Sequence, residues 1–147
     1  MKFLLLALAL ILSSQAYSQC LITTSKSKVL QDIVEQENGF QIGQGYEEMC
    51  KKLNNSNIGL SIEQISEITK YQTTVVTLIK GFPIEKEKKY GFKFLTGSGA
   101  NSIAYDIEKT SKKEKELMYL GVNHAFKILI ESQEIDKIIE EVNKMRE

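Results

Sequence analysis

The sequence has few of the residues that build common functional sites: no tryptophan, one proline, one histidine, two cysteines and a single arginine. One histidine, His124, cannot form a multi-histidine metal site. The single arginine, Arg146, leaves almost no bidentate clamp for phosphate or carboxylate groups. The glycine-rich stretch at residues 97–102 lacks the preceding strand and the Lys-Ser/Thr ending of a phosphate-binding loop. We therefore expect no metal site and no cofactor.

The chain also lacks an excess of positive or negative charge. The chain has 19 lysines and arginines against 19 aspartates and glutamates. Lysine clusters at residues 51–52, 86–89 and 112–115 are interleaved with acidic residues. A balanced chain of this kind has no overall positive potential to attract nucleic acid. We expect no nucleic-acid partner.

The first residues have the pattern of a secretory signal peptide. Lys2 is followed by an apolar run at residues 3–12 and by small polar residues up to Ser18. The pattern predicts that residues 1–18 are cleaved and that the protein is exported, to a periplasm or an extracellular space. No stable membrane insertion is expected, because the run is too short to span a bilayer comfortably. A lipid anchor on Cys20 is disfavoured by the poor lipobox before it.

After cleavage, residues 19–147 form a chain of ordinary single-domain length. Its two cysteines, Cys20 and Cys50, predict one disulfide in an oxidising compartment. The bridge would close a loop of about thirty residues and contribute on the order of 3 to 4 kcal/mol. Asn54 begins a glycosylation sequon, which matters only in a eukaryote. The sequence does not separate a bacterial from a eukaryotic origin.

Helical spacing dominates the rest of the chain. Capping residues followed by apolar residues at i, i+3, i+4 and i+7 predict amphipathic helices. Residues 111–131 are apolar around most of the helical wheel, with Gly121 inside the apolar arc, so other elements should pack around this helix. We expect a mainly α-helical, compact bundle of about five or six helices, over residues 24–38, 46–53, 61–80, 111–131 and 135–145 with a short helix at 103–107.

The segment at residues 84–99 allows two interpretations. Tyr90, Phe92 and Phe94 alternate with other residues as in a short strand, whereas residues 85–89 fit a charged helical turn. The three aromatic residues lie beside a lysine-rich run. They are either part of the core, which is the commoner place for aromatic residues, or an exposed contact surface.

Two further polar residues are candidates for ligand or partner contacts. Gln72 falls within the apolar arc of the helix expected at residues 61–80, where it either fixes the core register or faces a groove. His124 lies at the border of the apolar arc of the central helix, where a histidine bonded at the core edge is the commoner case. No nucleophile and acid are seen to converge on His124, so we assign no catalytic residue.

These patterns favour a small exported, non-enzymatic binding protein that acts through a protein partner. An inhibitor or immunity-type protein fits this class by analogy. One alternative is a carrier that holds a small apolar ligand in a helical cavity, with Gln72 and His124 as polar contacts. A less favoured alternative is a small hydrolase that uses His124 with a carboxylate.

Overall fold

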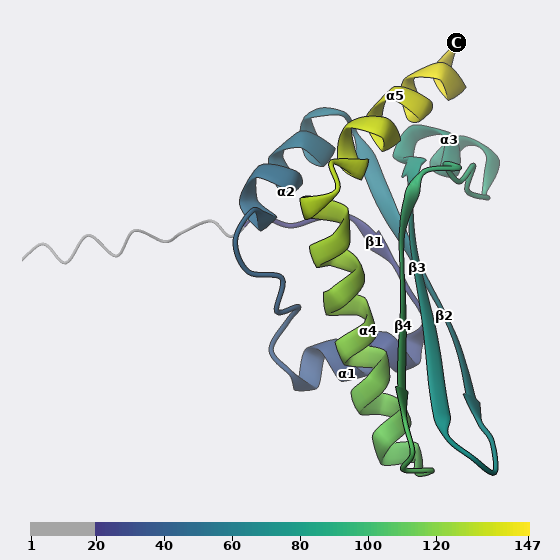
Figure 1. Cartoon of the computed structure of the whole chain (residues 1–147). Helices are drawn as coiled ribbons and strands as arrows, with labels where there is room; N and C mark the ends of the chain where they lie inside the picture. The colour runs from purple at the N-terminus through teal and green to yellow at the C-terminus, as the bar shows by residue number, and fades with distance from the viewer. Residues whose placement is uncertain (1–19) are drawn as a thin grey trace, which may run out of the picture.

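The computed structural model describes residues 20–147. The signal peptide predicted at residues 1–18 lies outside this part of the chain. Five helices and four strands follow one another in an α/β arrangement (Figure 1). In order they are β1 (Thr24–Ser25), α1 (Lys28–Gln36), α2 (Tyr46–Asn55), β2 (Ile58–Ile68), β3 (Thr73–Pro83), α3 (Ile84–Tyr90), β4 (Gly99–Asp106), α4 (Ser111–Glu131) and α5 (Glu134–Arg146).

The strands form one mixed sheet in the order β1-β2-β3-β4. β2 and β3 make a long antiparallel hairpin, and β4 adds antiparallel to the other side of β3. The short β1 pairs in parallel with β2 at Leu60 and Ser61 only. Because β4 is last in the strand order, it is an edge strand along its whole length.

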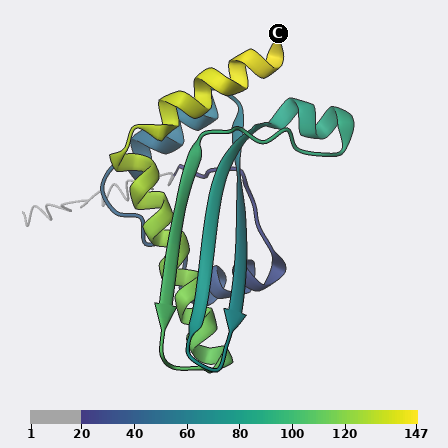
Figure 2. The same ribbon diagram turned by 45° about the vertical axis from the view of Figure 1, so that its right-hand side comes forward.

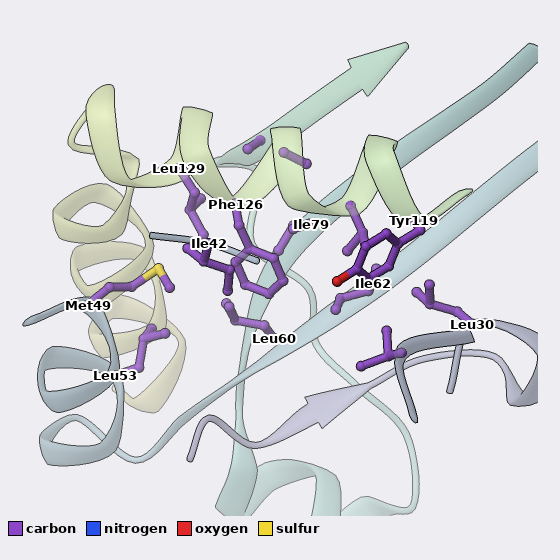
Figure 3. Packing of buried hydrophobic residues seen from close by; sticks show 14 of the residues in the cluster. Leu30, Ile42, Met49, Leu53, Leu60, Ile62, Ile79, Tyr119, Phe126 and Leu129 are labelled. Carbon is purple, nitrogen blue, oxygen red and sulfur yellow. The ribbon is translucent and has the colours of Figure 1, made fainter. Parts of the chain in front are cut away.

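Helices α1, α2, α4 and α5 gather on one side of the sheet, and no helix of the described chain covers the other side of β2, β3 and β4 (Figures 1 and 2). α4 runs along β3 and β4. Its Phe126 and Leu129 are buried against Leu60 and Ile79 of the sheet (Figure 3). The helix thus has the organising position that its wide apolar arc predicts, although it packs on strands.

Gly121 marks a close approach of α4 to the sheet. A Cβ atom at this position would lie 2.7 Å from Thr77 Oγ1. The hydroxyl of Ser102 donates a hydrogen bond of 2.7 Å to the Gly121 carbonyl, and Gln64 Nε2 donates to Thr77 Oγ1 and to the Met118 carbonyl. A small polar cluster therefore joins the middle of α4 to three strands.

The expectation of a mainly α-helical bundle is wrong, and residues 61–80 show why. This stretch contains most of β2, a turn and most of β3 instead of one helix. Ile62 and Ile79 are buried as expected, but Ile65 and Ile68 are exposed. The run Thr73–Thr77 is made of threonine and valine, whose branched β-carbons favour extended backbone.

Two other local expectations are also corrected. The short helix expected at residues 103–107 is replaced by β4, which ends at Asp106. Tyr90 ends α3, and the chain from Phe92 to Phe94 is irregular, so the helical turn is present and the short strand is not. Small residues at alternate positions of β4, Ala100 and Ser102, let α4 approach this strand closely.

The other helices agree with the prediction, although their ends differ. α2, α4 and α5 lie where the apolar spacing places them. α1 begins later than expected because its N-cap is Ser27, whose Oγ accepts a hydrogen bond from the Leu30 N–H. The cap of α4 is Thr110, whose Oγ1 accepts a hydrogen bond from the Lys113 N–H.

The predicted disulfide between Cys20 and Cys50 is confirmed, with Cα atoms 6.0 Å apart. It fastens the beginning of the described chain to the buried side of α2. Asn54 Nδ2 reinforces this junction by donating a 3.0 Å hydrogen bond to the Leu21 carbonyl. Across residues 20–147, no helix has the length and apolar character needed to cross a membrane.

Candidate interaction surface

Tyr90, Phe92 and Phe94 form one exposed cluster, which we call the aromatic tip. The Phe92 and Phe94 ring centroids are 4.8 Å apart, and the Tyr90 ring lies 5.8 Å from Phe94. Phe92 is 56% exposed. All three aromatic residues are therefore exposed and not part of the core.

The backbone places the aromatic tip beyond the end of the sheet. Pro83 ends β3 and directly precedes α3, which projects away from the other helices (Figure 2). Gly91 then reverses the chain with a φ of 76°, a left-handed conformation that glycine adopts without strain. Its N–H donates to the Glu87 carbonyl at 2.8 Å, which closes the helix and brings Phe92 back beside Tyr90.

One anchor holds the beginning of α3. Arg146, near the end of α5, donates from Nε to Glu85 at 2.7 Å and from an Nη atom to the Ser56 carbonyl at 2.8 Å. Asn57 also donates to Glu85, at 2.8 Å. These hydrogen bonds, that of Arg146 foremost, hold the pKa of Glu85 below its usual value.

A second anchor holds the chain where it returns to the sheet. Thr96 and Gly81 exchange two hydrogen bonds of 2.9 Å, one through the Thr96 hydroxyl. The Glu141 carboxylate on α5 accepts from the Gly97 N–H at 2.6 Å, from the Ser98 N–H at 3.0 Å and from the Ser98 hydroxyl. The Ser98 hydroxyl contributes most to a lowered pKa of Glu141. The aromatic tip is thus fixed at both ends.

Lysines surround the aromatic tip. Residues 84–95 contain four lysines and two glutamates, and both glutamates are already paired, Glu85 with Arg146 and Glu87 with Lys93 at 3.2 Å. Lys89 Nζ lies 5.0 Å from the centre of the Tyr90 ring, and Lys86 Nζ lies 5.8 Å from that of Phe94. The surface is apolar in the middle and positive at its rim.

The sequence analysis does not identify three residues of the two anchors, namely Arg146, Glu141 and Asn57. Glu85 and Arg146 are 61 positions apart, and Ser98 and Glu141 are 43 apart. The only signal is that Arg146 is the single arginine in the chain. No local spacing connects it with α3.

Gln72 and His124 do not come together. Gln72 lies in the turn between β2 and β3, where its side chain donates to Thr74 Oγ1 at 3.0 Å. The start of α4 is next to this turn, because Lys109 Nζ donates to the Lys70 carbonyl. His124 is exposed on α4, thirteen residues beyond Ser111, which is roughly 20 Å along a helix. The aromatic tip is at the opposite end of β3 from Gln72.

Metal ligands and free thiols are the remaining groups to consider within residues 20–147. No group of three or more histidine, cysteine, aspartate or glutamate side chains in this range could hold a metal ion. Both cysteines are joined in the disulfide. Comparison of the chain with models of protein families, with curated proteins and with solved structures found no match.

Proposed function

We propose that this protein is an exported, non-catalytic binding protein whose aromatic tip docks on an acidic surface of a partner protein. The observation that carries the proposal is the cluster of three exposed, mutually contacting aromatic rings with lysines at its rim. Aromatic residues are enriched in protein interfaces, whose centres are poor in charged residues and whose rims are polar. An inhibitor or immunity-type protein would use such a surface to block its partner.

Two features favour tight binding by this surface. The rings already contact one another, and the anchors at Glu85 and Glu141 fix both ends of the segment, so little conformational freedom is lost on binding. The rim lysines would steer an acidic partner toward the rings and make the association rate depend on salt.

Export is part of the proposal. The disulfide between Cys20 and Cys50 is of the kind that persists in oxidising compartments, and the signal-peptide pattern at residues 1–18 agrees with that location.

The test is capture of a partner from the exported fraction of the native cell by immobilised protein. The variant Tyr90→Ser/Phe92→Ser removes the two most exposed rings of the aromatic tip. Ile65→Ser is a matched control, because Ile65 is a similarly exposed apolar residue on a strand. We expect one partner to be captured by the wild type and by the control, at least about tenfold less by the aromatic-tip variant, and less at high salt.

Equal capture by the aromatic-tip variant would overturn the proposal, as would the absence of any captured protein. Native mass spectrometry of the same sample provides a further check. A retained small apolar molecule there would replace the proposal with the carrier hypothesis.

A further inference from the structure

The open side of the sheet, which we call the outer face, carries apolar residues without cover from the described chain. Ile65 is 67% exposed, Ile103 64% and Tyr105 68%. The register places Ile65 opposite Val76 and Val76 opposite Ile103, so one apolar row crosses β2, β3 and β4. This row ends at β4, the edge of the sheet (Figure 2).

The edge itself has none of the usual protection against pairing. β4 is eight residues long and contains no lysine or proline, and its one charged residue, Asp106, is at its end. Natural proteins commonly protect edge strands with lysine, proline, a bulge or a covering segment. At the opposite edge, by contrast, β1 covers part of β2.

We propose that two copies of this chain pair through β4, antiparallel about a two-fold axis at Ile103. In this register Ile103 meets Ile103 of the second copy, Asn101 meets Tyr105, and Ala100 meets Asp106. No two like charges stand opposite each other. The apolar row then continues without interruption across both copies, and the chain's balanced charge opposes no such association.

The position of α4 fits this pairing. The helix contacts both β3 and β4, so its axis lies about one strand spacing from the two-fold axis. With strands about 4.8 Å apart, the two α4 helices lie about 10 Å from each other, the distance of packed helices. The middle of α4 is at the centre of the pairing, because Ser102 bonds to the Gly121 carbonyl.

The side of α4 that faces the β4 edge is complementary to itself. Lys113, whose nearest carboxylate is Glu116 at 2.6 Å, also lies 3.9 Å from Asp106 of β4, which places it toward this side. Glu131 is five turns beyond Lys113 and so lies on the same side. In an antiparallel helix pair centred at Val122, Lys113 of each copy meets Glu131 of the other.

Sedimentation velocity of the disulfide-bonded mature protein, over a range of concentrations, tests this proposal. We expect a monomer–dimer equilibrium. Ile103→Glu places two carboxylates together on the axis and should raise the dissociation constant more than about tenfold. Ile65→Glu is the matched control: it adds the same charge to the same apolar row, away from the edge, and should leave the dissociation constant unchanged.

A charge exchange provides the second measurement. Lys113→Glu and Glu131→Lys should each weaken the dimer, and the double variant should restore it. A wild-type protein that stays monomeric at every concentration would overturn the proposal. Equal weakening by Ile65→Glu and Ile103→Glu would also overturn it, in favour of packing between outer faces. The measurement needs no other partner, so its outcome is independent of the function proposed for the aromatic tip.

Discussion

At the scale of single residues, Gly121 determines how closely α4 can lie on the sheet. We expect Gly121→Ala to lower the free energy of unfolding by about 1 to 3 kcal/mol, because the added methyl group would meet Thr77 Oγ1 at 2.7 Å in a packed interface. This loss exceeds the gain of up to about 1 kcal/mol from alanine's better helix propensity.

Urea unfolding followed by far-UV circular dichroism measures this change. Lys127→Ala is the control, because Lys127 is exposed on the same helix and its replacement should change stability by less than about 0.5 kcal/mol. A Gly121→Ala protein as stable as the wild type would show that α4 can move away from the sheet without loss.

At the scale of elements, the disulfide joins the chain before β1 to α2 across 30 positions. We expect Cys20→Ser/Cys50→Ser to lower the free energy of unfolding by about 3 to 4 kcal/mol, since the open chain gains conformational freedom when it unfolds. Denaturant unfolding of the variant beside the oxidised wild type measures the difference. A loss below about 1 kcal/mol would mean that the packing of α2 alone holds this junction.

The elements also show which patterns a single sequence can resolve. The apolar residues of α4 run from Leu117 to Ile130, nearly four turns of helix, and only a helix fits this spacing. The apolar residues of β2 and β3, such as Ile62 and Ile79, fit helical spacing and strand alternation about equally well over short stretches. The turn that separates these strands, residues 69–72, has no glycine or proline, so its sequence does not interrupt a predicted helix.

At the scale of the whole molecule, carboxylates with lowered pKa values link stability to pH. The pKa of Glu141 is lowered in the folded state, so its contribution is complete above the usual glutamate pKa of about 4.3 and is lost as the pH falls through the lower folded value. We expect Glu141→Gln to be less stable than the wild type at pH 7. The difference should shrink below about pH 4, where the wild-type carboxylate becomes protonated.

Denaturant unfolding between pH 7 and pH 3 provides the measurement. Glu63→Gln, an exposed site on the outer face, should follow the wild type throughout. A difference between Glu141→Gln and the wild type that stays constant with pH would show that the Glu141 charge does not act through its contacts with Gly97 and Ser98.

Part of the candidate site can be predicted from neighbouring residues in the sequence, and part of it depends on contacts between distant segments. The aromatic tip is visible in the sequence as three aromatic residues within five positions. The sequence does not show that these residues are exposed, because their exposure depends on where β3 ends relative to the helices. The anchors at Glu85 and Glu141 depend on α5 returning to the end of the sheet, which no local pattern encodes.

The contact between Arg146 and Glu85 has a consequence for the order in which the protein assembles during synthesis. Residue 146 is translated long after α3, so the N-terminal anchor of the aromatic tip cannot close until nearly the whole described chain has been made. Until then the segment that carries the three rings is held only through its connections to β3 and β4. The surface proposed to bind a partner is therefore fixed in place only after α5 has been made.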